Sequence, residues 1–369
     1  MVQHSPLQHP LEPARSLSEI FPPVRKSHIL NCGFPSWHSL YITITPKARI
    51  IPLTPEFLTY LREDGIILPD DEGPAPRVSS DSDDDRMDVS HTLGSDDDDP
   101  DDSSANPTQR FPELHAKIKS TIAALGGAVT PKLNWSAPKD ALFMTPTHTL
   151  ECRTASEIYL LLKSSDFITH DLEHAFDDCD PSDPTLASEI PYCLVLRKWF
   201  NLNPSMEFRA FVAGGRVTAI CQRDLNHYEF LISTREQLKD LIVDFHRNNL
   251  SDFPDPDFVF DVYITSENRV WLVDINPFAP RTESLLFSWA ELLRLRVGED
   301  TDDVELRLAG SGDAEAWGFG GSQYSASKLP KEVVEAGHQG EEAVWEFAKR
   351  WRDIIDKTDR QRKVGGEFD

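Results

Sequence analysis

The sequence predicts an α+β fold, chiefly because it contains two pairs of short apolar segments. Residues 207–212 with 216–222, and residues 258–264 with 270–278, are rich in β-branched and aromatic residues and flank short turns. Each pair should therefore form an antiparallel hairpin. Amphipathic helices are expected between and after the hairpins, without the regular strand–helix alternation of a doubly wound sheet. The 369 residues suffice for one large domain or two moderate ones.

In the N-terminal part of the chain, we predict one ordered segment between two disordered ones. Residues 1–24 are polar and proline-rich, lack the apolar core of a signal peptide, and are expected to form a disordered extension. Residues 25–69 should be ordered, with a helix near residues 55–63. Residues 70–104 are mostly Asp, Ser and Pro, with 14 acidic residues against two arginines between residues 70 and 102. They have almost nothing to bury, so we expect a disordered acidic loop.

Ordered sequence is expected again from residue 105 to residue 357. In the first of its helices, Leu114, Ile118 and Ile122 repeat at four-residue spacing before a Gly-Gly stop. Helices are predicted over residues 111–125, 156–163, 234–248, 282–295, 330–336 and 341–357, and a strand over residues 192–199. Residues 298–327 read as a loop, and residues 358–369 as a flexible tail.

Composition and spacing exclude several classes of function. A formal net charge of -25 argues against a protein that binds nucleic-acid phosphates. No apolar run approaches the roughly 18 residues of a membrane helix. The five cysteines are scattered without a CxxC pair, as expected for a reduced cytosolic protein. Neither a P-loop nor a GxGxxG motif is present, and no residue is predicted to be catalytic.

Two aspartates and an asparagine carry the clearest chemical signal. A hairpin centred on Glu267 and Asn268 places Asp261 opposite Asp274, and side-chain alternation puts Asn276 on the same face. Facing carboxylates repel each other, and a hard divalent cation bound by oxygen ligands would remove that repulsion. The sequence therefore predicts a Mg²⁺ site here, and the alternative is a solvated acidic face on an edge hairpin.

Two cationic segments precede this hairpin. Residues 131–140 combine Lys132, Lys139 and Trp135, which suit phosphates and a stacked base, although an ordinary surface loop is the alternative. Arg197 and Lys198 end a strand of four apolar residues, where a buried charge needs an anion as partner. That anion is either a ligand phosphate or a carboxylate of the chain.

The register of the first hairpin stays open at this point. A two-residue turn at Gly214 and Gly215 pairs Glu207 with Gln222 and sends Arg223 to the face opposite Arg209. If both arginines serve one site, a β-bulge must shift the register.

These segments resemble the cell-division-cycle protein 123 family. The resemblance covers about residues 28–355 and is carried by long, individually unusual blocks in a fixed order. They are residues 132–138, 164–169, 195–199, 207–209, 222–224 and 274–278, the last with 284–287. The resemblance implies an ATP-grasp fold, in which residues 25–69 and 105–357 form two lobes and the nucleotide is held between two β layers.

The resemblance also implies a role for each site residue. Phosphates are expected at Lys132, Lys139, Arg209 and Arg223, and the nucleotide beside Arg197 and Lys198. Trp199 and Phe200 would form the adenine-side connector, and the pocket would be lined by Asn134, Trp135, Ala137 and Asp140. Mg²⁺ is expected at Asp261, Asp274 and Asn276.

The family further implies a cytosolic chaperone that assembles eukaryotic translation initiation factor two, and so supports translation initiation and cell-cycle progression. Its partner would be the C-terminal domain of the gamma subunit, which it helps to join the alpha and beta subunits. We expect a monomer that needs neither membrane nor nucleic acid. The alternative is an ATP-grasp ligase or kinase acting on a small molecule or protein, but no acceptor pocket is evident in the sequence.

Overall fold

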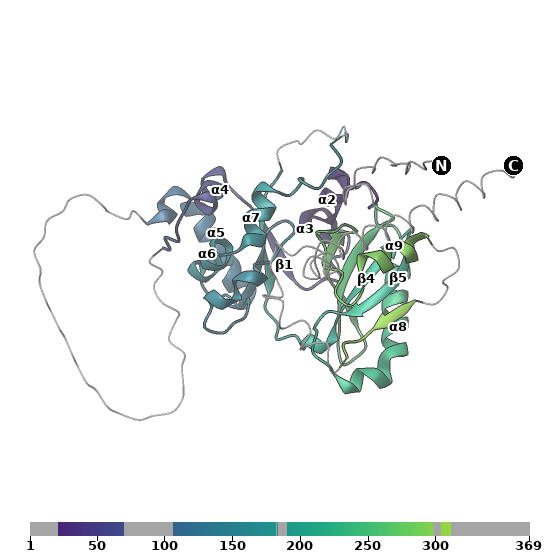
Figure 1. Ribbon diagram of the computed structural model, residues 1–369. Coiled ribbons are helices and arrows are strands. Elements are labelled where there is room, and N and C mark those ends of the chain that lie inside the picture. The colour runs from purple at the N-terminus through teal and green to yellow at the C-terminus, as the bar shows by residue number, and fades with distance from the viewer. Residues whose placement is uncertain (1–20, 70–105, 182, 184–189, 298–303, 311–369) are drawn as a thin grey trace, which may run out of the picture. The chain divides into compact units, whose positions relative to one another are not determined.

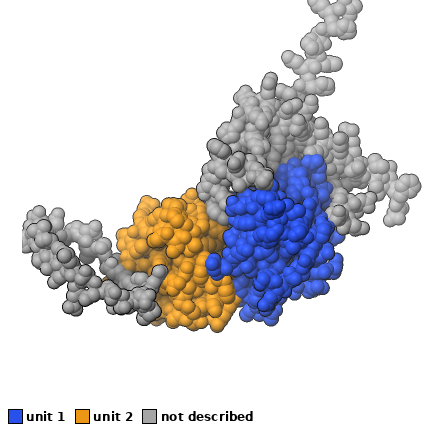
Figure 2. Space-filling model, turned by 90° about the horizontal axis from the view of Figure 1, so that it is seen from below, with its two compact units in different colours: residues 1–46, 174–190, 201–369 blue, residues 47–173, 191–200 orange. Residues whose placement is uncertain are grey.

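The computed structural model describes residues 21–69, 106–181, 183, 190–297 and 304–310 (Figure 1). The chain divides into two compact units (Figure 2): unit 1 comprises residues 1–46, 174–190 and 201–369, and unit 2 comprises residues 47–173 and 191–200. The predicted acidic loop, the last two predicted helices and the C-terminal tail lie outside the described residues. Among the described residues, no helix has both the length and the apolarity needed to cross a membrane.

Unit 2 is built on a three-stranded antiparallel sheet in the order β1-β3-β2. Its strands are β1 (Ala48–Pro52), β3 (Cys193–Lys198) and β2 (Val129–Lys132). Leu194 and Leu196 of β3 are fully buried in the apolar core, with Ile51 of β1 paired to Leu194. Alternate residues of the strands face the other way, and this second face carries the polar side chains discussed below.

Four helices contribute to the apolar core of unit 2. Ile118, Ile158 and Tyr159 are among its fully buried residues. The helices are α4 (Pro55–Arg62), α5 (Pro112–Ala124), α6 (Ala155–Lys163) and α7 (Asp166–Glu173), with the short turns η1 (Pro107–Arg110) and η2 (Lys139–Met144). The first three helices confirm the sequence predictions, whereas α7 was not predicted.

Unit 1 contains a five-stranded sheet in the order β7-β6-β4-β5-β8, antiparallel except that β8 runs parallel to β5. Its strands are β4 (Glu207–Ala213), β5 (Arg216–Gln222), β6 (Phe258–Ile264), β7 (Val270–Pro277) and β8 (Glu305–Arg307). Both predicted hairpins are thus confirmed. Its other elements are α2 (Lys26–Cys32), α3 (Phe34–His38), η3 (Pro204–Met206), α8 (Glu229–Asn249) and α9 (Trp289–Val297).

The two faces of this sheet pack against different helices. On one face, His246 of α8 stacks on Phe260 with ring centroids 5.9 Å apart. On the other, Phe211 and Val259 belong to an apolar cluster with Trp289 and Leu292 of α9. Figure 1 shows α8 and α9 against the strands of this unit.

Four predicted boundaries need correction. Helix α8, expected over residues 234–248, begins five residues earlier, at Glu229. The helix expected over residues 282–295 begins at Trp289, because Ser288 and Glu291 form a capping interaction there: the Glu291 amide donates to Ser288 Oγ, and the Ser288 amide donates to the Glu291 carboxylate. Strand β8 lies within the predicted loop 298–327. Phe21, expected in the disordered extension, is buried with its ring 5.1 Å from that of Trp289.

Candidate functional site

A β-bulge settles the register of the β4–β5 hairpin. Val212 pairs with Val217 as a two-residue turn requires, but Phe211 pairs with Ala219, so Thr218 is the extra residue. Beyond the bulge, Arg223 donates its amide hydrogen to the Glu207 carbonyl at 2.9 Å. Arg223 therefore lies on the same face as Arg209, which is the arrangement that one shared site requires.

A second bulge lies in the β6–β7 hairpin. Asp261 pairs with Asp274, as predicted, but Val262 pairs with Leu272, so Val273 is the extra residue on β7. The bulge changes which side chains are buried: Leu272 is fully buried, while Trp271 is half-buried. The Arg269 guanidinium covers the Trp271 ring at 3.9 Å.

The β4–β5 bulge and the regular pairing of Asp261 with Asp274 bring five predicted site residues to one face of the unit 1 sheet. Arg209 pairs directly with Asp261 across β4 and β6, and Asn276 pairs with Val259 two positions from the aspartate pair. The residues on this face are Arg209, Arg223, Asp261, Asp274 and Asn276. They lie on, or directly after, four strands that neighbour each other in the sheet, so the sheet and not one loop brings them together.

Asp261 is already paired with cations of the chain. Arg209 donates to its two carboxylate oxygens at 2.8 and 2.9 Å, and both side chains are buried. Arg223 lies 3.5 Å from the same carboxylate, and Arg209 also donates to the Glu283 carbonyl. The guanidinium groups therefore offset the repulsion that was expected between Asp261 and Asp274.

The remaining members of this face fit a hard cation. The side-chain amide nitrogen of Asn276 is buried and has no hydrogen-bond partner among the described residues, so it is a donor for an acceptor such as a phosphate oxygen, while its amide oxygen is the atom that a cation would need. No cluster of three His, Cys, Asp or Glu side chains suited to a metal occurs in the described parts of the chain. Two carboxylates and one amide are nonetheless an oxygen donor set of the kind that Mg²⁺ takes when water and phosphate supply its other ligands.

In unit 2, the polar face of the sheet brings together two of the predicted cations. Lys132 pairs with Val195, and Thr130 pairs with Arg197, so Lys132 and Arg197 lie on the same face. Lys132 is fully buried and Arg197 half-buried. Lys198 points to the opposite face by alternation and is exposed, with its ammonium 5.4 Å from the exposed Phe200 ring. The predicted pair of Arg197 and Lys198 is therefore split between the two faces.

Other predicted pocket residues already bond within unit 2. Asn134 is buried, donates to the Pro191 carbonyl at 3.1 Å and accepts from the Cys193 amide at 2.9 Å. Asp140 accepts from Ser165 Oγ and from the first amides of α7, so it caps that helix. Trp135, Ala137, Lys139 and Trp199 are half-buried.

One residue of this region was missed by the sequence analysis. Asp171 on α7 is buried and accepts hydrogen bonds from Ser136 N at 2.8 Å, Trp135 N at 3.2 Å and Ser136 Oγ at 2.7 Å. Burial raises the pKa of Asp171 to about 6, although these hydrogen bonds and the charge of Lys132 lower it. A signal existed: an acidic residue lies in the helical stripe of Ile168 and Leu172, both buried.

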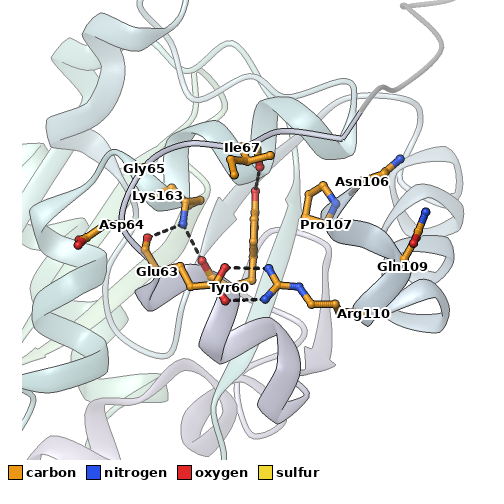
Figure 3. Close-up of a pocket in the computed structure, with 10 residues that line it drawn as sticks. All are labelled: Tyr60, Glu63, Asp64, Gly65, Ile67, Asn106, Pro107, Gln109, Arg110 and Lys163. Atoms are coloured by element: carbon orange, nitrogen blue, oxygen red, sulfur yellow. Dashed lines mark hydrogen bonds and ion pairs between the residues drawn. The ribbon is translucent and has the colours of Figure 1, made fainter. Parts of the chain in front are cut away.

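A cavity of about 240 Å³ in unit 2 contains none of the predicted residues (Figure 3). Its two cations are engaged: Arg110 donates to both carboxylate oxygens of Glu63, and Lys163 donates to the carbonyls of Tyr60 and Glu63. Burial lowers the pKa of Lys163. Lys163 therefore caps the C-terminal end of α4, and we do not assign a phosphate to this cavity.

Fold and site together define a two-unit α+β protein in which each sheet carries a set of polar and charged side chains on one face. A model of the D123 family matches residues 37–337. The chain therefore belongs to the D123 family, and the family expected from the sequence blocks is confirmed.

Relatives and solved structures agree with this assignment. The chain is 50% identical over 369 residues to the "Translation initiation factor eIF2 assembly protein" of Aspergillus niger, covering 96% of this chain and 95% of that protein. It is 45% identical over 395 residues to the "Cell division cycle protein 123" of Aspergillus terreus, covering 91% of each. The structure of Cdc123 from Schizosaccharomyces pombe is similar with a TM-score of 0.64 and 42% identity, covering 79% of this chain and all of that one. The predicted α+β fold class is confirmed, and the fold is that of Cdc123.

Proposed function

We propose that this chain binds ATP with Mg²⁺ and assists the assembly of eukaryotic translation initiation factor two. The names of its relatives support the assembly role, because the similarity extends over nearly the full length of both proteins. The cofactors are supported by the charged and amide side chains that each sheet carries on one face. As in the sequence analysis, ATP would be bound in an ATP-grasp manner.

The cofactor roles follow from the chemistry of each set. Lys132, Lys139 and Arg197 of unit 2, and Arg209 and Arg223 of unit 1, supply the positive charge that phosphates require. Asp261, Asp274 and Asn276 would hold Mg²⁺, which neutralises phosphate charge when bound. Because Arg209 already pairs with Asp261, we expect Asp274 and Asn276 to contribute most to metal affinity.

One observation carries the metal proposal: Asp261 and Asp274 pair across neighbouring strands, and Asn276, whose side-chain oxygen can ligate a cation, lies on the same face. Asp274→Ala should weaken Mg²⁺-dependent ATP binding about tenfold or more, because few carboxylates are available to replace it. Calorimetry with ATP, with and without Mg²⁺, measures this. Glu267→Ala, an exposed carboxylate in the turn of the same hairpin, is the matched control and should bind like the wild type. Unchanged affinity in Asp274→Ala would disprove the metal assignment.

For the partner, we propose the C-terminal domain of the gamma subunit, bound by a cytoplasmic monomer. Purified gamma subunit and its isolated C-terminal domain should bind the chain with similar affinity, measured by biolayer interferometry. A gamma subunit lacking that domain is the control and should not bind. Equal binding of the truncated subunit would refute the choice of domain and leave the ATP proposal untouched.

ATP turnover tests the alternative that the chain is a ligase or kinase. A chaperone should hydrolyse little ATP on its own, whereas an enzyme of the ATP-grasp class would turn over ATP with its acceptor in the absence of the initiation factor. Consumption of ATP by the pure chain, measured with and without the gamma subunit, distinguishes the two: robust turnover without the subunit would favour the enzyme.

A further inference from the structure

We propose that Asp171 is a positioning residue for the nucleotide: it holds the turn between Lys132 and Lys139 in the conformation that binds ATP. This inference rests on the proposed ATP binding of the same segment. It assigns to Asp171 no contact with ATP, because its carboxylate is already occupied by groups of the chain.

The geometry that carries the proposal is the convergence of three donors on one carboxylate. The amides of Trp135 and Ser136 both donate to one oxygen of Asp171, at 3.2 and 2.8 Å, and the Ser136 hydroxyl donates to the other at 2.7 Å. Two consecutive residues are thereby fixed in backbone and side chain. The turn is closed by a further bond of 2.9 Å from the Leu133 amide to the Ser136 carbonyl.

The turn that Asp171 holds lies between two lysines proposed to contact phosphates. Lys132 ends β2 immediately before the turn, and Lys139 begins η2 immediately after it. Both lysines are proposed phosphate contacts, so a shift of the turn would move both attachment points. Holding a binding loop in its bound conformation improves affinity, because the ordering cost is met before the ligand arrives.

A buried carboxylate is a costly way to hold a turn if only stability matters. Asp171 is 2% exposed, and burial of its charge is unfavourable. The titratable groups near it on neighbouring elements are Lys132 of β2, and Tyr192 and Cys193 at the start of β3. Of these, only Lys132 carries a positive charge. The carboxylate thus interacts with the Lys132 charge, and its hydrogen bonds orient the turn that follows Lys132.

The test compares two substitutions at one position in the full chain. Asp171→Ala removes all three hydrogen bonds. Asp171→Asn keeps the shape: its oxygen can accept from both amides, and its NH₂ group can donate to the Ser136 hydroxyl, which then acts as acceptor. We expect Asp171→Ala to raise the Kd for Mg²⁺–ATP about tenfold or more, the range seen for residues that orient a binding group. Asp171→Asn should stay within about threefold of the wild type.

Leu172→Ala on the same helix is the control for a loss of stability, because Leu172 packs in the core of unit 2 and forms none of the three hydrogen bonds that hold the turn. It should lower the melting temperature and leave the Kd nearly unchanged. The proposal is overturned if Asp171→Ala binds ATP like the wild type, if Asp171→Asn fails to rescue, or if Leu172→Ala weakens ATP equally. If the wild type itself does not bind ATP, the proposed function fails first, and that result is separate.

Discussion

Arg209 shows how much a single buried cation contributes to this fold. Its guanidinium forms two bonds to Asp261, and both side chains are at most 6% exposed. Arg209→Ala would remove both of these bonds from the buried Asp261 carboxylate and leave it the longer contact with Arg223 at 3.5 Å, so it should lower the free energy of unfolding by about 3 kcal/mol. Denaturation in urea measures the change.

The control for Arg209 is an arginine–aspartate pair at the surface. Arg247 and Asp244 lie three residues apart on α8, with side chains 69% and 60% exposed. Arg247→Ala should cost less than about 1 kcal/mol. Similar small losses in both variants would show that the buried pair has no special role.

A second prediction concerns Asp171 and the pH dependence of the free energy of unfolding. Its pKa is about 6 in the folded chain, above the ordinary value of 3.8. A raised pKa means that folding favours the protonated form, so this contribution to stability is complete below pH 3.8 and is lost as the pH rises through 6. Asp171→Asn cannot ionise. Between pH 4 and pH 7, the wild type should therefore lose stability relative to this variant, by on the order of 2–3 kcal/mol.

Urea unfolding of the wild type and Asp171→Asn at several pH values tests this prediction. The difference between their unfolding free energies should change with pH and level off above about pH 7. Parallel curves across the whole range would mean that Asp171 titrates normally.

At the same scale, the sequence predicted the chemical type of the site residues better than their partners. Asn134 and Asp140 have the polarity of ligand-binding residues, but their hydrogen bonds go to Pro191 and to the start of α7. Asn134 and Pro191 are 57 positions apart. Partners this distant along the chain leave no local pattern, so the sequence could not separate a ligand contact from an internal one.

Among the elements, local caps mark helix starts, but a start was predicted correctly only where the apolar pattern agreed with the cap. Thr154 and Glu157 form a capping box at α6, and Ser288 and Glu291 mark the start of α9. The α9 prediction was wrong because the apolar residues 285–287 were read as helical. Leu285 has a φ of 54°, which no α-helix contains. Helix α7 was missed although Ser165 caps it locally by accepting from the Ile168 amide, and its second cap, Asp140, lies 26 residues before it.

The β-bulges were harder to predict than the strands. A shared site for Arg209 and Arg223 requires a bulge, but no residue type marks Thr218 as its position. The pairing of Asp261 with Asp274 was correct even though the bulge at Val273 was not foreseen. A bulge depends on how both neighbouring strands pack, and the burial of β6 on both faces is a property of the whole sheet.

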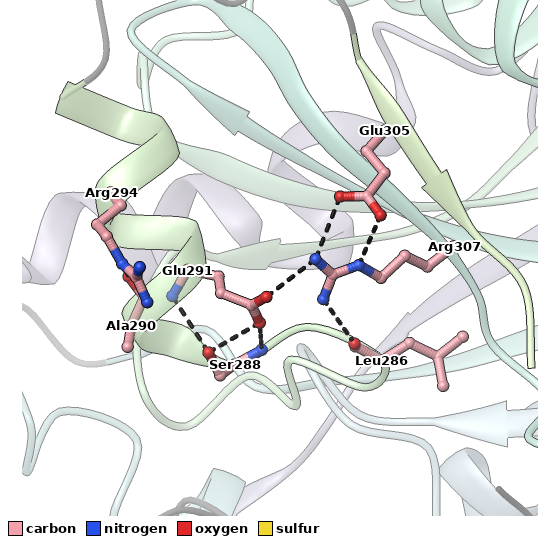
Figure 4. Close-up of polar contacts among 7 residues, drawn as sticks. All are labelled: Leu286, Ser288, Ala290, Glu291, Arg294, Glu305 and Arg307. Atoms are coloured by element: carbon pink, nitrogen blue, oxygen red, sulfur yellow. Dashed lines mark hydrogen bonds and ion pairs between the residues drawn. The ribbon is translucent and has the colours of Figure 1, made fainter. Parts of the chain in front are cut away.

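The edge strand β8 depends on one arginine (Figure 4). Arg307 donates to Glu305 at 2.9 Å and to Glu291 of α9 at 2.9 Å, and its guanidinium lies 3.9 Å from the Phe287 ring. Burial would raise the pKa of Glu291, but hydrogen bonds from Arg307 and Ser288 outweigh it and lower the pKa to about 2. The strand is thereby joined to the start of α9.

This network predicts that Glu291 contributes to the stability of the fold at neutral pH and that the contribution is lost in acid. Because the folded pKa of Glu291 is below its ordinary value of 4.5, its contribution is present above pH 4.5 and is lost as the pH falls toward 2. Glu291→Gln should lower the melting temperature at pH 7, and its difference from the wild type should narrow between pH 5 and pH 3. Calorimetric melting at these pH values measures the difference. A constant difference would show that the charge of Glu291 is irrelevant and only its size matters.

For the whole molecule, the class of fold was predictable but its division was not. The α+β assignment followed from two hairpins, each formed by neighbouring segments of chain. Unit 2, in contrast, is completed by residues 191–200, which return as the central strand β3 after an excursion through unit 1. The sequence predicted this strand, but its pairing with β1, about 145 residues earlier, is a long-range contact that no local pattern reveals.

The distribution of charge gives the last prediction. Residues 72–104 contain 12 acidic residues and two arginines, and their only large apolar side chains are Val78, Met87, Val89 and Leu93. So little apolar area cannot add much to a core. Replacing these residues with a Gly/Ser linker of equal length keeps the loop-closure entropy similar and reduces the net charge from -25 to -15. The melting temperature should not fall, and the Kd for ATP should not rise. At low salt the variant should melt slightly higher, because charge repulsion within the chain is smaller. A lower melting temperature at both low and high salt would mean that the acidic residues make specific contacts that stabilise the fold.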